Sequence, residues 1–312
     1  MESIVGKAGR VPKGYSRIGD DVAVIPLGPG RLVAKVDMLV EGTDVPKGMT
    51  YREAARKAVA MCVSDFAAKG ARPDSFLISL GLRKGVTQEE VEGLAQGLRD
   101  AEQEWDAHLV GGDTNESSEL VIDCAMVGFA RKLVTRVGAS PGDRLVVTGL
   151  FGYTRAGLKI LMEGASAEAK FAESAKGSVL HPTPNLRVGL ALAPYLTSAM
   201  DSSDGLARSL HTLAKESGVG FEVIALPVGQ GVERFARTNG LSTEQLVLEG
   251  GEEYIIVGTV KGSKFSSAAK AVKRAGGELI EIGMATSSKG RVELRVRGSY
   301  KPIRNEGWTH LR

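Results

Sequence analysis

Hydrophobic and polar residues alternate over residues 31–37 (RLVAKVD), which predicts a strand with two different faces. One face consists of Leu32, Ala34 and Val36, and the other of Val33, Lys35 and Asp37. Apolar runs bounded by turn residues predict further strands. They cover residues 76–82, 120–128, 145–149, 220–226, 253–260, 278–285 and 291–297.

A period near 3.6 residues predicts helices over residues 51–69 and 87–105. Thr50 is the expected N-cap of the first, and Gly70 follows its end. The second opens on TQEE, in which Thr87 and Glu90 match a capping box. Shorter helices are expected at residues 154–162, after PTPN, after SSDG, and at residues 263–275.

Both halves of the chain mix strands and helices without strict β-α-β alternation, which favours the α+β fold class. The length of 312 residues suits about two domains. The turn-rich stretch GASPGD begins at Gly138, so we expect one domain at residues 1–137 and a second at residues 138–312.

Composition excludes several classes of protein. Hydrophobic residues make up 43% and charged residues 25%, which is ordinary for a globular protein. The net charge is only +3, and no block of basic residues indicates binding to nucleic acid. The two cysteines, Cys62 and Cys124, lie in apolar surroundings and favour neither a disulfide framework nor a zinc site. No apolar run has membrane-spanning length, so we expect a cytoplasmic protein. The Gly- and Lys/Arg-rich residues 1–17 are expected to be mobile until a ligand binds.

Six aspartates occupy positions where a core, small or turn residue is expected. Asp65 is the clearest, because it shares a helix face with Met61 and Cys62. Three of the other positions also have a purely structural explanation when taken one at a time. Asp204 or Ser203 could cap a helix, Asp113 could belong to a turn, and Asp37 could pair with Lys35 or an arginine. The six are Asp20, Asp37, Asp65, Asp113, Asp201 and Asp204.

Carboxylates that converge repel one another by about 4 kcal/mol per pair at 4 Å and an effective dielectric near 20. These motifs hold few lysines or arginines, and hard divalent cations suit oxygen ligands. We therefore predict Mg²⁺ with a polyphosphate. Glycines would allow backbone amides to approach phosphate, and the helix after SSDG adds a favourable dipole. The glycines are Gly19, Gly111, Gly112 and Gly205; Walker A and protein-kinase motifs are absent from the sequence.

Seven motifs, in this order, resemble one known family. They are GDDVAVI, VDMLVEGTDVP, RKAVAMCVSDFAAKGARP, VGGDTNE, RVGASPGD, MDSSDGL and GGEEY, with a terminal GWTH. The set resembles the thiamine-monophosphate kinases, most closely those of archaeal type. These belong to the aminoimidazole ribonucleotide synthetase-like (PurM-like) superfamily. The resemblance spans nearly the whole chain.

The resemblance implies a two-domain PurM-like fold. Its N-terminal mixed sheets join into a barrel-like homodimer interface near which ATP binds, and an α/β sandwich completes the site. It implies transfer of the ATP γ-phosphoryl to thiamine monophosphate, giving thiamine diphosphate. The implied Mg²⁺ ligands are Asp20, Asp37, Asp65, Asp113, Asp201 and Asp204. The implied ATP contacts are Gly112, Asp113, Arg136 and Ser203, and the implied substrate contacts are Asp44, Glu252 and Trp308.

The implied reaction needs no general base, because a phosphate monoester with a pKa near 6 is mostly dianionic at neutral pH. The four histidines therefore need not form a catalytic set. The groups expected to act in catalysis are Asp65, Asp113, Arg136 and Asp204, and no phosphorylated aspartate is expected.

The chain departs from the family pattern at three places. Lys35 and Val36 stand where many bacterial members have hydroxyl residues, so one metal site is expected to differ or to be replaced by the Lys35 charge. Asp44 stands where bacterial members often have His, and HPTPNLR replaces a more basic segment. Two alternatives stay open: another ATP-using enzyme of the superfamily with a different acceptor, and a non-catalytic nucleotide-binding dimer. Selenophosphate synthetase-like enzymes are disfavoured because the first cysteine is Cys62.

Overall fold

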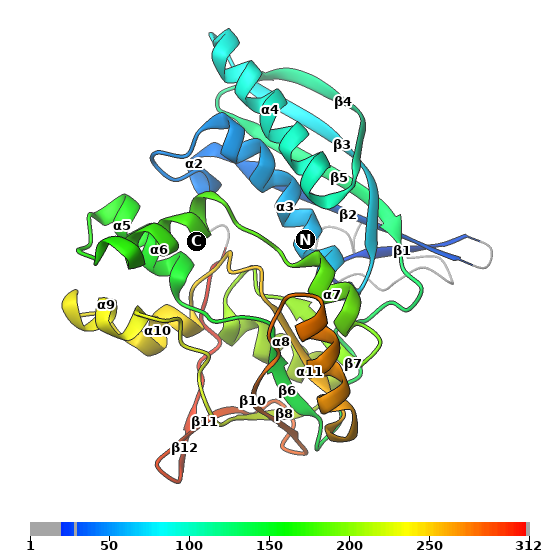
Figure 1. Ribbon diagram of the computed structural model, residues 1–312, viewed down its shortest axis with the longest axis vertical. Coiled ribbons are helices and arrows are strands. Elements are labelled where there is room, and N and C mark those ends of the chain that lie inside the picture. Colours follow the sequence, from blue (N-terminus) through cyan, green and yellow to red (C-terminus); the bar gives the residue numbers. More distant parts are fainter. Residues whose placement is uncertain (1–19, 28–29, 310–312) are drawn as a thin grey trace.

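The computed structural model describes residues 20–27 and 30–309, and each half of the chain contains one β-sheet (Figure 1). The segment 1–17 and Gly19, to which the sequence analysis assigned roles, lie outside the described residues. No helix among the described residues is both long and apolar enough to cross a membrane.

The N-terminal sheet has five strands in the order β1-β2-β5-β3-β4. Neighbouring strands are antiparallel except β3 and β4, which are parallel. The sheet is open, and its outer strands are β1 and β4. The strands are β1 Ala23–Leu27, β2 Gly30–Val40, β3 Arg72–Arg83, β4 His108–Ser117 and β5 Val121–Phe129.

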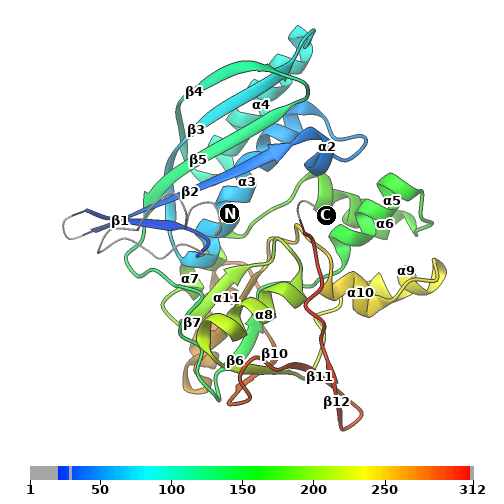
Figure 2. The ribbon, with the colours of Figure 1, turned by 180° about the vertical axis from the view of Figure 1, so that it is seen from behind.

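Two long helices cover one face of this sheet. They are α3 (Tyr51–Lys69) and α4 (Gln88–Trp105), which pack on each other in front of the strands in Figure 1. Seen from behind in Figure 2, the other face carries none of the described helices. The short helix α2 (Glu41–Asp44) follows β2. The sheet therefore has one covered face and one open face.

Helix α3 begins and ends where the sequence predicts. The side chain of Thr50 accepts from the amide of Glu53, and the Glu53 side chain accepts from the Thr50 amide. Gly70 ends the helix with a φ of 64°, a left-handed conformation that glycine adopts without strain. A Cβ at Gly70 would lie 2.2 Å from that of Ala193, so a larger residue would also clash. Almost the whole helix is buried, including three charged residues, Lys57, Asp65 and Lys69.

The C-terminal sheet has seven strands in the order β12-β11-β8-β10-β6-β9-β7, with β11 and β8 parallel. Its strands are β6 Arg144–Val147, β7 Leu196–Asp201, β8 Gly220–Val223, β9 Ile256–Val260, β10 Ile280–Thr286, β11 Val292–Val296 and β12 Ser299–Pro302. Its helices are α5 Tyr153–Glu163, α6 Ala169–Leu180, α7 Leu186–Leu192, α8 Leu206–Ser217, α9 Val232–Thr238, α10 Thr243–Leu248 and α11 Phe265–Arg274; η1 covers Gly262–Lys264.

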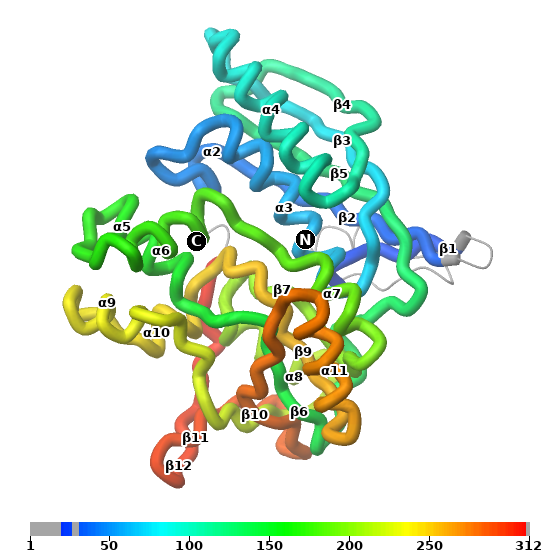
Figure 3. The backbone as a smooth tube through the Cα atoms, in the orientation of Figure 1, coloured from blue at the N-terminus to red at the C-terminus, as the bar shows by residue number. Residues whose placement is uncertain are grey.

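The two halves share part of their core. Ala67 and Ala68 of α3 pack with Leu192 of α7 and Ala199 of β7. In Figure 3 the α7 segment lies beside α3, between the two sheets. Helix α3 is thus the element on which the N-terminal sheet and the C-terminal half meet. The predicted boundary between residues 137 and 138 stays a prediction.

The fold confirms the α+β class and most predicted elements, with three differences. Asp113 lies inside strand β4, so the alternative explanation of this residue as part of a turn is wrong. The predicted strand 253–260 begins only at Ile256, because Glu252 and Tyr254 adopt φ values of 58° and 50° that no strand accommodates. Strands β4 and β7, helix α6 and the short elements α2, α9, α10 and β12 were not predicted.

Candidate active site

Five carboxylates gather where β1, β2, α3 and β7 approach one another, and we refer to them as the acidic cluster. Within it, Asp21, Asp65 and Asp201 each offer an oxygen, and these atoms all lie within 4.8 Å of one another. All three residues are buried. The acidic cluster consists of Asp20, Asp21, Asp37, Asp65 and Asp201.

Lys69, at the end of α3, neutralises one side of the acidic cluster. Its ammonium lies 2.7 Å from a carboxylate oxygen of Asp20 and 2.7 Å from one of Asp21. It also donates to the carbonyl of Ala199, at 2.6 Å. Arg136 approaches Asp21 from the other side, and its Nε donates to Asp21 Oδ1 at 2.7 Å. Asp21 is therefore held between two cations.

Lys35 and Ser64 contact the remaining carboxylates. The ammonium of Lys35 lies 2.6 Å from Asp65 Oδ2 and 3.1 Å from Asp37 Oδ1. The hydroxyl of Ser64, in α3, donates to Asp201 Oδ2 at 2.6 Å. The expectation that few cations neutralise these aspartates was wrong, because Lys35, Lys69 and Arg136 all pair with them. The lysines lie far along the chain from most of the acids that they contact.

Burial and mutual repulsion set the pKa values of these carboxyl groups. Burial, helped by Asp201 and Asp37 and opposed by Lys35, raises the pKa of Asp65 well above its usual value. Burial, with the charge of Asp21, raises the pKa of Asp201 to about 6. Burial acts the same way on Asp21, but Lys69 and Arg136 outweigh it and lower that pKa. The Asp65 and Asp201 side of the acidic cluster is thus short of positive charge.

This side of the acidic cluster fits a hard divalent cation. Three carboxylate oxygens within 4.8 Å of one another are the ligand type that Mg²⁺ prefers, and no sulfur or imidazole competes among them. A bound cation would offset the burial and the repulsion that raise the pKa values of Asp65 and Asp201. Asp21 belongs to this group, whereas the sequence predicted Asp20, which stays a predicted ligand.

A second set of predicted residues meets beside the N-terminus of α8. The backbone carbonyl of Asp204 accepts from the backbone amide of Trp308 at 3.0 Å, and the backbone carbonyl of Ser203 accepts from that of Glu252 at 2.7 Å. The capping explanation fails here, because Gly205 occupies the N-cap and no side chain caps α8. The first amides of α8 therefore keep their capacity to bind an anion.

Lys57 links this set to the N-terminal half. Its ammonium, on a fully buried side chain, lies 2.6 Å from Glu252 Oε1 and donates to the backbone carbonyl of Asp44 at 2.7 Å. The Asp44 carboxylate itself accepts from the Val40 amide and the Thr43 hydroxyl. The structure thus brings Asp44, Glu252 and Trp308 to one region, with Lys57 between the first two.

Asp113 and Gly112 lie apart from the acidic cluster within a single chain. Both are in β4, the exposed outer strand of the N-terminal sheet. Gly112 has a structural reason to be glycine, because a Cβ there would lie 2.0 Å from the carbonyl oxygen of Ile78. The roles assigned to these two residues by the resemblance remain predictions.

Glu253 is a buried carboxyl group that the sequence analysis missed. It accepts from the backbone amide of Gly152 at 2.7 Å, at the start of α5. Burial raises the pKa of Glu253 to about 7, although hydrogen bonds from the backbone amides of residues 152–154 act to lower it. Because Glu252 and Tyr254 on either side have positive φ values, Glu253 anchors a strained loop.

We expect the Glu253→Gln variant to lose a pH dependence of stability. An acid whose pKa rises from about 4.5 to about 7 on folding destabilises the protein as pH increases through that window. The free energy of unfolding of the wild type should therefore fall by about 3 kcal/mol more than that of the variant between pH 4.5 and 8. Urea unfolding of both proteins at several pH values measures this, with Glu173→Gln, at an exposed glutamate of α6, as control. Parallel profiles for wild type and variant would contradict the assignment.

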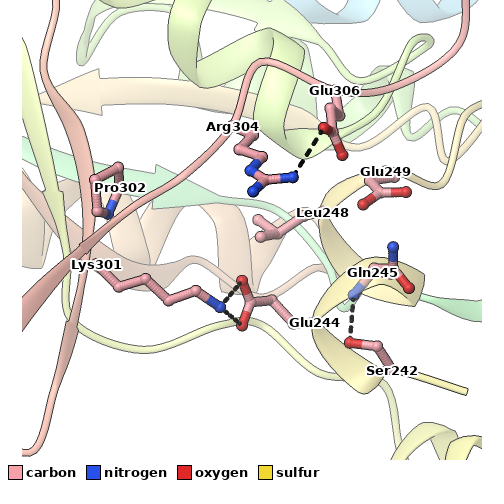
Figure 4. A pocket seen from close by; sticks show the side chains of 9 residues that line it. All are labelled: Ser242, Glu244, Gln245, Leu248, Glu249, Lys301, Pro302, Arg304 and Glu306. Atoms are coloured by element: carbon pink, nitrogen blue, oxygen red, sulfur yellow. Dashed lines mark hydrogen bonds and ion pairs between the residues drawn. The ribbon is translucent and has the colours of Figure 1, made fainter.

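A hollow of about 310 Å³ lies elsewhere, between α10 and β12 (Figure 4). Its charged groups neutralise one another: Lys301 pairs with Glu244 at 2.8 Å, and Arg304 approaches Glu306 at 3.8 Å. None of the residues predicted to bind metal, ATP or substrate lines it. The acidic cluster and the Glu252 region therefore remain the candidate active site.

Comparison with known proteins agrees with this geometry. Residues 19–130 match the family model described as AIR synthase related protein, N-terminal domain, and residues 140–295 match the corresponding C-terminal domain. A thiamine-monophosphate kinase of Nitrosopumilus maritimus is 39% identical over 94% of this chain and 93% of its own length. The chain belongs to the thiamine-monophosphate kinase family. The family's member in Pyrococcus horikoshii is 31% identical over 95% of this chain and 91% of its own length.

Solved structures of thiamine-monophosphate kinases share the fold of this chain. The structure described as AaThiL complexed with AMPPCP and TMP superposes with a TM-score of 0.86. It is 27% identical and covers 99% of this chain and 95% of that one. A thiamine monophosphate kinase from Aquifex aeolicus gives a TM-score of 0.82 at 26% identity, over 96% of each chain. The two-domain PurM-like fold expected from the sequence is confirmed.

Two lysines and one serine that contact the C-terminal half were not predicted from the sequence, whereas Lys35 was expected to contribute its charge near Asp37. Lys57, Ser64 and Lys69 lie in α3 and contact the C-terminal half, and Lys35 lies in β2. One signal was available in the sequence: Lys57 and Lys69 stand at the two ends of the mostly apolar stretch 58–68, within which Asp65 also lies. Charged residues in a buried helix need partners, so each lysine could have been expected to pair with a carboxylate.

Proposed function

We propose that the chain is an ATP-dependent kinase that phosphorylates thiamine monophosphate to thiamine diphosphate. The observation that carries the proposal is the acidic cluster. Its Asp21, Asp65 and Asp201 oxygens lie together where α3 and β7 of the shared core meet. It is supported by relatives named thiamine-monophosphate kinase over most of the chain, and by a structural neighbour described with AMPPCP and TMP. A cytoplasmic location suits such a biosynthetic step.

The residues of the acidic cluster would hold the triphosphate end of ATP through Mg²⁺. When bound, Mg²⁺ supplies positive charge to the phosphate oxygens and lowers the repulsion between the two anionic substrates. Arg136 and Lys69 fix Asp21 from two sides, so this ligand needs no rearrangement. The uncapped N-terminus of α8 offers backbone amides to a phosphate group. Asp113 and Gly112 are proposed ATP contacts as well.

The acceptor, thiamine monophosphate, would bind beside Glu252 and Trp308. The thiazolium ring of the substrate is cationic and aromatic, which suits a partly exposed indole and a carboxylate. Trp308 is 48% exposed, and Glu252 is held in place by Lys57. The acceptor phosphate is already mostly dianionic at neutral pH, so the protein has to orient the nucleophile and does not have to deprotonate it.

A coupled ADP-release assay with ATP, Mg²⁺ and thiamine monophosphate tests the proposed function. ADP release that requires the acceptor and matches the thiamine diphosphate formed would support it. Release of ADP with a different phosphate ester, and none with thiamine monophosphate, would place the chain among other ATP-using enzymes of the superfamily. ATP binding without turnover would favour a non-catalytic protein.

We also propose that the open face of the N-terminal sheet binds a second copy of this chain. Val36 in β2 and Leu77 in β3 are both paired in register with Ala125 of β5, so the three form one row across the sheet. Four large apolar side chains of this sheet are exposed: Val36 by 58%, Met38 by 56%, Leu77 by 46% and Phe129 by 53%. A group of large exposed apolar side chains on a sheet face that no helix covers is typical of an interface with another protein surface.

We expect charges on this face to produce monomers. The double variant Leu77→Glu and Phe129→Glu should keep its fold, since both side chains are exposed in the single chain. Sedimentation at about 10 µM should give a mass near 32.9 kDa for the variant and twice that for the wild type. Met162→Glu, at a 60% exposed position on α5, is the matched control and should remain dimeric. A monomeric wild type would refute the dimer.

A further inference from the structure

Lys35 lies in the acidic cluster where two carboxylates from different elements face each other. Asp37 is two residues further along the same face of β2, and Asp65 comes from α3. The Lys35 ammonium lies between them, 3.1 Å from one and 2.6 Å from the other. Its side chain is only 20% exposed, so water does little to screen these contacts. This ammonium lowers the repulsion between the two carboxylates, which is the effect that a metal ion bridging them would have.

The charges of the acidic cluster leave room for one divalent ion. When its five carboxylates are all ionised, the three cations that pair with them leave two negative charges uncompensated. That deficit equals the charge of a single Mg²⁺. It falls on the side of Asp201, whose carboxylate accepts only from the neutral Ser64 hydroxyl among the contacts described. The three oxygens that converge are those of Asp21, Asp65 and Asp201.

We propose that Lys35 is a built-in cation that takes the place of a divalent ion between Asp37 and Asp65, so that the acidic cluster of each chain binds one divalent ion. The inference rests on the proposed function, because it concerns the metal complement of the same site. Lys35 is a positioning residue here: it holds Asp65 for the ion shared with Asp21 and Asp201. An ammonium on a strand cannot dissociate, so this part of the acidic cluster keeps one positive charge at any Mg²⁺ concentration.

Counting bound Mn²⁺ by electron paramagnetic resonance tests the proposal without any turnover. Nucleotide-free Lys35→Thr should bind one more Mn²⁺ per chain than the wild type, since the threonine hydroxyl adds a ligand where the charge is removed. Lys35→Arg should keep the wild-type number. Lys289→Thr, at an exposed lysine between β10 and β11, is the control and should also keep it. Equal numbers for wild type and Lys35→Thr would overturn the proposal.

A second measurement does not depend on the folding of a variant. Anomalous diffraction from wild-type crystals soaked in Mn²⁺ should show one ion among Asp21, Asp65 and Asp201, with the Lys35 ammonium still between Asp37 and Asp65. An ion between Asp37 and Asp65 with Lys35 displaced, or no ion in the acidic cluster, would overturn the inference. Failure of the proposed acceptor would appear only in the ADP-release assay and would leave these ion counts unchanged.

Discussion

The Asp65→Asn variant should lose kinase activity by a factor of about 10² to 10³ in kcat/KM, without loss of the fold. Asp65 offers one of the three converging oxygens, so the variant holds the cation that neutralises transition-state charge with one carboxylate fewer. Removing a single preorganised electrostatic group from such a site costs about 3–4 kcal/mol of transition-state stabilisation. The coupled ADP-release assay at saturating and limiting Mg²⁺ measures the loss.

Stability separates this role of Asp65 from a structural one. Asparagine keeps the shape of Asp65 and a side-chain oxygen that can accept from Lys35, and Lys35 keeps the Asp37 carboxylate as its partner, so the metal-free fold is expected to tolerate the change. The melting temperature in EDTA should therefore change little, whereas the increase produced by Mg²⁺ should shrink, since ligand binding stabilises by mass action. Asp74→Asn, at an exposed aspartate of β3, should behave as wild type in both measurements. Wild-type kcat/KM in Asp65→Asn would contradict the proposed site.

The sequence singled out several residues of the candidate site but not how they are arranged. Asp65 stood out because a carboxylate on an apolar helix face has no ordinary explanation, and the structure buries it in the acidic cluster. Helix α3 was predicted to the residue, because Thr50 and Gly70 are local signals that need no tertiary context. Lys35 and Asp37 were placed on one face of β2 by simple alternation, which is a property of any strand.

Contacts between segments that are distant in the chain could not be predicted from such local signals. Asp21 joins Asp65 and Asp201 only after β1, α3 and β7 have packed together, and adjacent Asp20 gives no local sign that it points elsewhere. The segment around Glu253 looked like a strand because its apolar residues continue into β9. The backbone turns at Glu252 and Tyr254, and a buried hydrogen bond to the start of α5 outweighs the local preference.

The Lys69→Met variant should show the largest loss of stability. All three ammonium hydrogens of Lys69 have acceptors, in Asp20, Asp21 and the Ala199 carbonyl, and the side chain is fully buried. Methionine keeps the volume but leaves these acceptors without their cation. Breaking a buried ion pair by removing one partner costs about 3–5 kcal/mol. For a chain of this size, a fall of about 10 °C in melting temperature is expected in EDTA.

The dependence of this loss on pH identifies its cause. In the wild type, burial alone would raise the pKa of Asp21, but Lys69 and Arg136 lower it below 3.8, so the stability that they contribute is present above that pH. Without Lys69 the Asp21 pKa rises, because Arg136 alone opposes the effect of burial, and protonation in acid then removes the charge that needs a partner. The destabilisation measured by urea unfolding should therefore be large at pH 7 and smaller at pH 4. Lys84→Met, at an exposed lysine after β3, should be neutral at both. A loss of equal size at the two pH values would mean that packing around Lys69, and not its charge, holds this end of α3 against β7.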